Sequence, residues 1–190
     1  YTPVVNVRGE ADRLGVALQN MRQNLLTLSE ENKTRTWLLT GTSELNDTMR
    51  GEKEVHELAQ DIINKLSSYL NTQVGAVYVA ENGHLELAGS YAFNQRKGNT
   101  NLVKRGEGLV GQSALEKKPI VFSNIPDDYI QVNSGLGSAK PKNILVYPFL
   151  YDGNVHGVIE LGTVREFADT DMQLLEVVSN NIGIAFNSAR

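Results

Sequence analysis

The first long pattern in the chain is a stripe of apolar residues spaced four and three apart. It consists of Leu14, Leu18, Met21, Leu25 and Leu28. The positions between them are almost wholly polar, so the stripe is as narrow as the seam of a coiled coil. This spacing predicts a helix that begins near residue 10 and associates with another helix through these five side chains. An amphipathic helix that packs on its own domain is the alternative interpretation.

The stripe is interrupted at residues 32–35 and resumes in a different phase. Trp37, Leu38 and Leu39 come first, followed by Leu45 and Met49. A change of phase locally overwinds or underwinds a coiled coil. It indicates either a junction where a signal passes between modules or the end of a helix, and both interpretations stay open.

The next segments have the patterns of a helix and a β-hairpin. Residues 52–70 carry the broad apolar stripe of a helix that packs on a sheet. Residues 74–80 are short, β-branched and nearly all apolar, as in a central strand. Asn82-Gly83 predicts a tight turn into an alternating strand at residues 85–93.

The second half of the chain predicts a short strand near residues 102–103, a glycine-rich turn, a brief helix and a strand at 119–122. A second hairpin at 144–150 and 155–162 and a final helix from about Asp169 complete it. The long segment at 123–143 holds too many apolar residues for simple disorder and is expected to fold over something. We therefore predict an α+β domain, with a roughly five- to six-stranded, mostly antiparallel sheet and helices on one face, preceded by an N-terminal coiled-coil stalk helix.

Composition narrows the possible functions. The 190 residues include 18 basic and 22 acidic side chains, and a net charge of −4 shows no bias toward nucleic acid. The absence of cysteine excludes disulfides, thiolate nucleophiles and cysteine-based zinc sites. No apolar run is long enough to span a membrane. The chain starts at Tyr1 rather than Met, which indicates a piece of a longer protein.

Gly106, Gly108 and Gly111 match the GxGxxG pattern of dinucleotide-binding loops. That chemistry needs a buried strand before the glycines and a crossover helix of at least ten residues after them, and neither is expected here. The glycines more simply allow a tight entry into a short helix. Lys104 and Arg105 beside that helix start are a possible contact for an anion.

No catalytic residues are expected. His56 lies on a helix within Val-His-Glu-Leu, but the Thr-Pro or Asn-Pro pair of phosphoacceptor motifs does not follow it. His84 and His156 have no carboxylate or histidine at ligand spacing, so no metal site is expected. No nucleophile elbow is present either. The chain is therefore not predicted to be an enzyme.

The order and spacing of several stretches resemble a GAF domain from about residue 53 to 190, and more narrowly the GAF domains of bacterial sensor and hybrid histidine kinases. The stretches that carry the resemblance are residues 73–80, 106–112, 126–129, 134–137, 143–149 and 157–161. Upstream, residues 10–21 resemble the second helix of a HAMP linker, with residues 4–7 as its connector. Asp12 stands where HAMP linkers commonly have Gly, and Gln19 where they have Asn.

These resemblances imply a domain organisation and a function. Residues 1–33 would be the HAMP-like connector and helix, 34–52 a linker helix and 53–190 the sensory domain. The module would be the cytoplasmic portion of an inner-membrane receptor, a homodimer through its N- and C-terminal helices, in a parent chain with a histidine kinase core. It would bind a small molecule and pass on a conformational signal. A ligand-free dimerisation and relay scaffold is the alternative.

The pocket of the resembled family lies between the sheet and the loops over it. Strand alternation and the helix start together give the candidate lining residues Tyr91, Phe93, Leu109, Phe122, Tyr129, Ile130, Tyr147 and Phe149, each of which could equally be plain core. Bilin attachment usually needs a cysteine, and the cyclic-nucleotide motif is not found in order, so both ligands are disfavoured. Sulfoxide reduction on this fold uses cysteines and is disfavoured too. The ligand stays unidentified.

Overall fold

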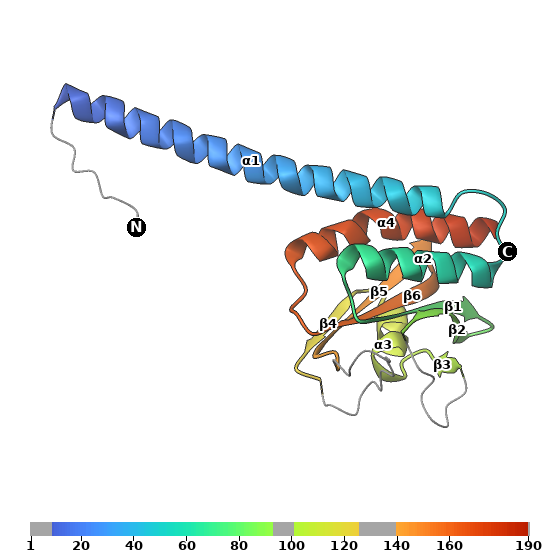
Figure 1. The fold of residues 1–190 in the computed structure, drawn as a ribbon. Helices are drawn as coiled ribbons and strands as arrows, with labels where there is room; N and C mark the ends of the chain where they lie inside the picture. The colour runs from blue at the N-terminus through green and yellow to red at the C-terminus, as the bar shows by residue number, and fades with distance from the viewer. Residues whose placement is uncertain (1–8, 93–100, 126–139, 190) are drawn as a thin grey trace. The chain divides into compact units, whose positions relative to one another are not determined.

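The computed structural model describes residues 9–92, 101–125 and 140–189. The chain divides into two compact units, Tyr1–Thr40 and Gly41–Arg190. Helix α1 (Glu10–Thr48) runs unbroken from the first unit into the second (Figure 1). Residues 32–35 lie inside this helix, so the change of phase in the sequence does not mark a helix end. The connector predicted at residues 4–7 lies outside the described residues.

The second unit is built on a single antiparallel sheet of six strands, ordered β3-β2-β1-β6-β5-β4. This confirms the predicted α+β class and the two predicted hairpins, β1–β2 and β5–β6. The strands are β1 (Val74–Glu81), β2 (His84–Tyr91), β3 (Leu102–Lys104), β4 (Ile120–Ser123), β5 (Asn143–Tyr151) and β6 (Asn154–Thr163). The mostly apolar strands β1 and β6 pair at the centre, where both faces of the sheet are covered.

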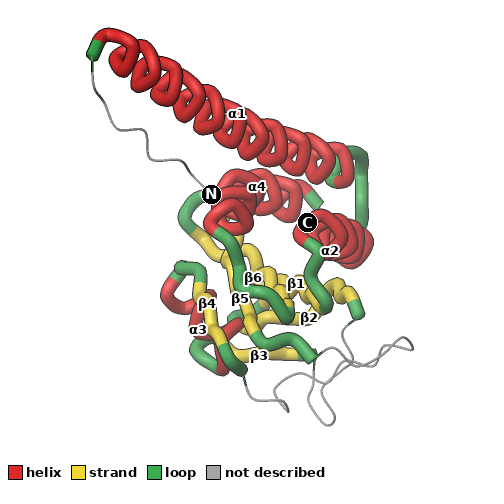
Figure 2. The backbone as a smooth tube through the Cα atoms, turned by 60° about the vertical axis from the view of Figure 1, so that its left-hand side comes forward, coloured by secondary structure: helices red, strands yellow, loops and turns green. Residues whose placement is uncertain are grey.

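Helices cover both faces of the sheet (Figures 1 and 2). The helices α2 (Val55–Leu70) and α4 (Asp169–Ser188) lie side by side on one face, as predicted, while the short α3 (Gly108–Glu116) lies on the other. A Cβ on Gly75 or Gly89 would collide with α2, so both residues face that helix. Alternate positions of β1, beginning with Val74, form an apolar cluster on the α3 face.

Helix α4 lies unusually close to β5. A Cβ on Gly183 would stand 2.1 Å from the carbonyl oxygen of Leu150. One turn further, the ring of Phe186 stacks on that of Phe149 with 4.9 Å between centroids. A glycine at position 183 therefore sets the distance between α4 and the sheet.

One arginine joins the ends of three elements. The guanidinium of Arg165 donates to both carboxylate oxygens of Asp171, at 2.7 and 3.2 Å, and to the carbonyl of Leu70 at 2.7 Å. Asp171 also accepts from the backbone N–H of Ala168, which caps the start of α4. The end of α2, the end of β6 and the start of α4 are thereby held together.

The last turns of α1 belong to the second unit and contact both of its long helices. Gly41 lies against Tyr69 of α2 and Leu174 of α4. Leu45, one turn on, is 1% exposed. Polar contacts flank these two residues: Lys65 pairs with Glu44 at 3.2 Å, and the side-chain amide of Asn181 donates to that of Asn46 at 3.0 Å. Residues 41–48 are called the α1 seat below.

Candidate functional site

A buried polar pair stands out in the apolar cluster on the α3 face of the sheet. The hydroxyl of Tyr78 on β1 donates to Oε2 of Glu160 on β6, at 3.2 Å. The two residues are 5% and 2% exposed. Ala76 and Val146 lie opposite Glu160 on the neighbouring strands, so apolar residues flank the carboxyl group within the sheet. Burying a carboxyl group costs free energy that a hydrophobic residue at this position would not.

Apolar residues of α3 and of the sheet surround this pair. Val110 and Ala114 of α3 pack on this cluster together with Ile144 and Val158 of the sheet. Leu109, one of the predicted pocket residues, packs against the cluster and is half-buried. Among the described residues, the Tyr78–Glu160 pair therefore places two polar groups within a cluster that is otherwise built from apolar side chains.

The glycine motif has the structural role expected from the sequence. Gly106 and Gly108 have φ values of +85° and +62°, which favour glycine. A Cβ on Gly111 would stand 2.2 Å from the carbonyl oxygen of Lys104. The glycines thus let the chain turn from β3 straight into α3.

Lys104 and Arg105, the possible anion contacts, are both exposed. A carboxylate of the chain already occupies this turn, since Glu107 accepts from the backbone N–H of Lys104 at 3.0 Å. The backbone N–H of Lys104 therefore already has an acceptor within the turn, and nothing in the geometry of the turn adds support for a bound anion.

The predicted pocket residues do not come together as expected. Tyr147 and Phe149 lie on the opposite face of the sheet, toward α4, because they alternate with the positions that face α3. Tyr91 pairs with Gly75 and so lies on the α2 face, and it is partly exposed. Phe122 on β4 is also exposed. These four placements correct the predicted pocket.

Three further candidates, Phe93, Tyr129 and Ile130, lie outside the described residues. Of the eight predicted pocket residues, only Leu109 is therefore found on the α3-side cluster in the part of the chain that the structure describes.

Two tyrosines, Tyr147 on β5 and Tyr69 on α2, have raised pKa values. Burial raises the pKa of Tyr147, the negative charge of Glu176 on α4 raises it further, and a hydrogen bond with Ser179 opposes both effects. Burial likewise raises the pKa of Tyr69, with a smaller contribution from Glu44 in the α1 seat. Both phenols therefore stay neutral to a higher pH than in the unfolded chain.

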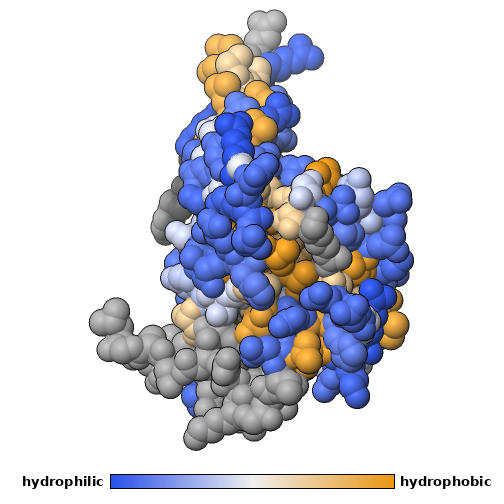
Figure 3. All heavy atoms as spheres, turned by 90° about the vertical axis from the view of Figure 1, so that its right-hand side faces the viewer, coloured by the Kyte–Doolittle hydropathy of each residue, from blue (hydrophilic) through white to orange (hydrophobic). Residues whose placement is uncertain are grey.

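The five residues of the predicted helical seam are exposed on one side of α1. Leu14, Leu18, Met21, Leu25 and Leu28 have between 55% and 64% of their surface accessible. Apolar side chains gather on the part of α1 at the top of Figure 3. Within the first unit, nothing among the described residues covers this surface.

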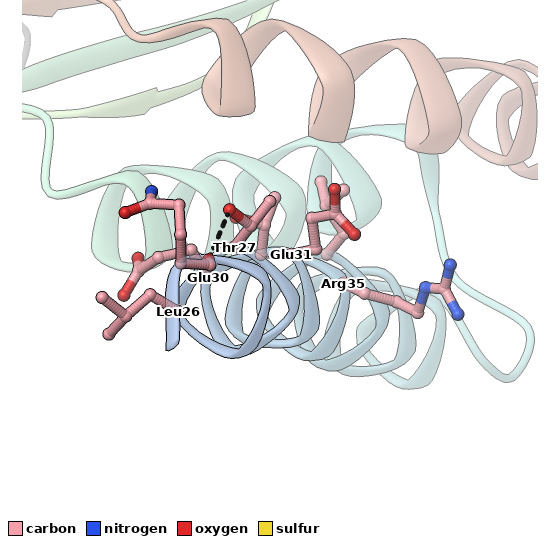
Figure 4. Close-up of a pocket in the computed structure, with 8 residues that line it drawn as sticks. Leu26, Thr27, Glu30, Glu31 and Arg35 are labelled. Atoms are coloured by element: carbon pink, nitrogen blue, oxygen red, sulfur yellow. Dashed lines mark hydrogen bonds between the residues drawn. The ribbon is translucent and has the colours of Figure 1, made fainter. Parts of the chain in front are cut away.

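Two hollows lie away from the sheet. One, of about 590 Å³, follows α1, and all of its lining residues come from that helix: Gln23, Leu26, Thr27, Glu30, Glu31, Thr34, Arg35 and Leu38 (Figure 4). The other, of about 650 Å³, lies between the turn at 49–54, the start of α2 and the end of α4. The first has a wall of a single helix and mixed charge, and the second is lined largely by acidic and small residues around Lys53, so neither has the form of an apolar ligand pocket.

The described residues contain no group of three or more side chains that could hold a metal ion. In the same part of the chain, no helix has both the length and the apolar content needed to cross a bilayer.

Sequence reasoning missed Tyr78 and Glu160 as site residues. The signal was present in part, because Tyr78 interrupts the apolar run of β1 and Glu160 lies in the buried second half of β6. What the sequence did not reveal is that the two side chains share a face and lie within hydrogen-bonding distance.

Comparisons with known proteins agree with this architecture. A family model described as GAF domain matches residues 52–187. The chain is also 25% identical over 109 residues to hybrid signal transduction histidine kinase G of Dictyostelium discoideum, a match that covers 55% of this chain and 3% of that protein. The chain thus corresponds to a small part of that relative's length.

Solved structures share the fold at low sequence identity. The nlh2 GAF domain of A. aeolicus in an inactive state has a TM-score of 0.64 at 22% identity, over 83% of this chain and 99% of that one. The GAF domain of a phosphoenolpyruvate-protein phosphotransferase from Coxiella burnetii has a TM-score of 0.67 at 16% identity, over 80% and 94%. The enzyme fRMsr of Staphylococcus aureus in complex with substrate has a TM-score of 0.61 at 17% identity, over 78% and 95%. The fold is therefore shared by GAF domains of larger proteins and by fRMsr.

Proposed function

Because the chain belongs to the GAF domain family, we propose that it is the sensory relay module of a signalling protein related to hybrid histidine kinases. It binds a small molecule on the α3 face of its sheet and passes a conformational signal through its terminal helices. The observation that carries the ligand-binding part is the buried Tyr78–Glu160 pair. A carboxyl group kept within an apolar cluster favours a ligand with an apolar body and a hydrogen-bond donor.

Native mass spectrometry of the protein purified from cells tests for the ligand directly. We expect a reproducible extra mass per chain. The compound identified is then titrated against Glu160→Gln, which keeps the shape of the side chain and replaces the carboxyl group with an amide. Affinity should fall about tenfold or more, because the amide has one acceptor oxygen in place of two and a hydrogen bond from the ligand is lost. Glu57→Gln, on the exposed side of α2, is the matched control and should bind normally.

An unchanged affinity in Glu160→Gln would refute the assignment of the site. A protein without an adduct, and without thermal stabilisation by any compound in a metabolite screen, would refute ligand binding. The second candidate function would then remain, a ligand-free dimerisation and relay scaffold. The α1 seat favours that candidate independently, since it ties an unbroken helix to both α2 and α4.

The relay requires a dimer, and the exposed seam on α1 supports the proposal that the dimer forms there. Complete burial of a Leu or Met side chain contributes about 1.5–3 kcal/mol, so a side chain that is already partly covered contributes roughly 1–1.5 kcal/mol. Five residues from each of two chains then provide on the order of 10–15 kcal/mol. This is of the same order as the loss of about 4–15 kcal/mol in translational and rotational freedom on association.

Leu18→Asp should convert the dimer to a monomer while the second unit stays folded, because a carboxylate in the seam would be buried without a partner. Analytical ultracentrifugation measures the first effect and circular dichroism the second. Gln23→Asp adds the same charge at an exposed position outside the seam and should remain dimeric. A dimer that persists in Leu18→Asp would show that the seam is not the interface.

The setting of the module within a receptor is part of this proposal. The resemblance of residues 10–21 to the second HAMP helix supports a place next to a membrane receptor's signal linker, and α1 is helical there. A histidine kinase core in the same parent chain is supported by the match to the hybrid kinase. In this arrangement the module is a homodimer on the cytoplasmic side of the inner membrane and has no catalytic role of its own.

A further inference from the structure

The two edges of the sheet differ in how their backbone groups are covered. Strand β4 lies at one edge, and β3 followed by the last residues of β2 forms the other (Figure 2). An edge strand leaves the N–H and C=O groups of alternate residues without a neighbouring strand, so another chain can pair with them. Folded proteins usually cover such groups or protect them with charged residues.

Helix α2 closes the edge beyond β3. Strand β3 pairs only with residues 84–86 of β2. Further along β2, the side-chain amide of Gln60 donates to the carbonyl of Ser90 at 2.8 Å and accepts from the N–H of Ser90 at 3.2 Å. Asn64 accepts a hydrogen bond from the same amide at 2.9 Å, which fixes its orientation. The amide of Gln60 thus occupies the place that a peptide group of an added strand would take.

Strand β4 has no such cover among the described residues. It pairs with β5 on one side, and no described side chain hydrogen-bonds to the backbone of residues 120–123. The strand reads Ile-Val-Phe-Ser and carries no charge. Val121 and Phe122 are 49% and 46% exposed. Because successive side chains point to opposite faces, a strand added here would gain an apolar contact on both faces.

We propose that the outer edge of β4 is a docking site for an extended, acidic segment of a partner protein, which adds to the sheet as a further strand. In this mode of recognition, backbone hydrogen bonds provide affinity and the side chains beside the strand provide specificity. The proposal is independent of the ligand site and of the dimer proposed above.

Lysines at both ends of β4 favour an acidic partner. Two precede the strand, and two lie beside its end, where β5 begins: Lys117, Lys118, Lys140 and Lys142. All four are exposed. Within the described ranges none of the four pairs with a carboxylate, whereas Lys53 and Lys65 near α2 each pair with one. The lysines beside β4 are therefore available to the carboxylates of a partner.

Two carboxylates of the chain lie near Lys117. Glu116 accepts a hydrogen bond from Gln112 within α3, and Asp152 precedes Gly153, whose carbonyl accepts from the ammonium group of Lys117 at 2.7 Å. In the part of the chain that the structure describes, neither carboxylate forms an ion pair with a lysine of this edge. Residues 117–125 and 140–146 contain no acidic residue, so the edge itself carries only positive charge.

The same lysines disfavour a second copy of this chain as the partner. Two β4 strands that paired antiparallel would bring the start of each strand next to the end of the other. Lysines of both copies would then approach one another at either end, and like charges repel. A strand with an apolar centre and acidic residues at its ends would instead meet four ammonium groups without carboxylate partners.

A synthetic peptide of the sequence Glu-Glu-Val-Thr-Val-Glu-Glu, blocked at both termini, is the probe. We expect it to bind the chain with a dissociation constant below about 1 mM. Hydrogen exchange followed by NMR should show that backbone amides of β4 become protected at least about tenfold on binding. The same peptide with proline at its central position is disfavoured as a strand and should bind at least about tenfold more weakly.

Substitutions on the two edges of the sheet locate the site. Phe122→Ser removes an exposed apolar contact and should weaken binding about fivefold to tenfold. Lys142→Glu reverses a charge beside β4 and should weaken binding about threefold or more, with a smaller effect at high salt. The matched controls are Leu102→Ser and Lys104→Glu at exposed positions of β3, and both should bind the peptide as the wild type does.

Three outcomes would overturn the proposal. The first is the absence of saturable binding by the acidic peptide. The second is binding that leaves the amides of β4 unprotected or that the β3 controls weaken equally, which would place the peptide elsewhere. The third is a site for charge alone: the proline peptide would bind as well as the original, and phosphatidylglycerol vesicles or a short DNA duplex would bind with the same dependence on Lys142. None of these results would affect the proposed function.

Discussion

Gly183→Ala tests how closely α4 is seated on the sheet. The added Cβ would stand 2.1 Å from the Leu150 carbonyl oxygen, although real Cβ contacts essentially never fall below 3.0 Å. The obstacle is the backbone of β5, an interior strand, so it cannot rotate away as a side chain could. Helix α4 must therefore move outward by about 1 Å, which loosens the stack of Phe186 on Phe149.

Two opposing terms determine the size of the effect. Overpacking of this kind costs about 1–3 kcal/mol, and a collision with backbone belongs at the upper end of that range. Alanine is favoured over glycine within a helix by about 1 kcal/mol, which offsets part of the cost. We expect the free energy of unfolding to fall by roughly 2 kcal/mol, and the melting temperature by about 4–8 °C for a chain of this size.

Urea unfolding, followed by near-ultraviolet circular dichroism of the buried aromatic residues, measures this change. Gly15→Ala is the matched control: it makes the same substitution within a helix, at a position where an added Cβ meets nothing within 4 Å. It should leave the unfolding midpoint of the second unit, Gly41–Arg190, unchanged and stabilise α1 by about 1 kcal/mol. If Gly183→Ala unfolds at the wild-type midpoint or above it, the close approach of α4 to β5 is wrong.

Three further perturbations test other parts of the unit. Leu45→Ala empties the buried core of the α1 seat and should lower stability by about 2–5 kcal/mol in urea titrations, whereas Leu39→Ala, on exposed surface, should stay within about 0.5 kcal/mol of wild type. Arg165→Lys keeps the charge but not the paired hydrogen bonds to Asp171, so we expect the free energy of unfolding to fall by about 1–2 kcal/mol. An unchanged free energy of unfolding would show that the paired hydrogen bonds contribute little to stability. The pKa of Tyr147 is raised on folding, so the folded state holds its proton longer and stability should fall as pH rises above the ordinary value of 10.0; Tyr147→Phe should flatten that slope, and an equal slope would contradict the pKa shift.

The sequence was sufficient to predict the elements of the sensory unit but not which face of the sheet each residue occupies. In β5 nearly every residue is apolar, because helices cover both faces of this sheet. A period of two separates the residues into two sets without indicating which helix covers each set. Tyr147 and Phe149 were correctly placed in one set, and that set faces α4 rather than α3.

Tyr91 shows a second limit of strand alternation. Opposite the pair of Val77 and Tyr78, β2 contains one extra residue, Ala88. This bulge moves every later residue of β2 to the other face, so Leu87 faces α3 while Gly89 and Tyr91 face α2. The alternating sequence at residues 85–93 contains no signal for the bulge.

Glu160 differs from Tyr91 in this respect, because a carboxyl group in the buried part of a strand can be recognised in the sequence.

The change of phase in α1 has a structural explanation that connects the two units. Leu18 and Leu25 belong to a stripe that stays exposed, whereas Gly41 and Leu45 belong to a stripe that packs on α2 and α4. Both stripes lie on one unbroken helix, so in the proposed relay a rotation of the seam must either turn the α1 seat or strain the helix between them. The seat is densely packed, and packed interfaces change between discrete arrangements rather than deform continuously.

The same reasoning continues from the α1 seat to the buried pair. Glu160 lies opposite Val146 on β5, and β5 also carries Phe149, whose ring stacks on Phe186 of α4. In the proposed function, a ligand that changes the position of β6 or β5 would act on α4 through the stack of Phe149 on Phe186, and α4 in turn contacts the α1 seat through Asn181. Coupling through such a network requires two discrete arrangements that the ligand binds with different affinity. The closeness of α4 to β5 at Gly183 makes a shift of the strand without a shift of the helix costly, which is why this glycine is the most informative position to change first.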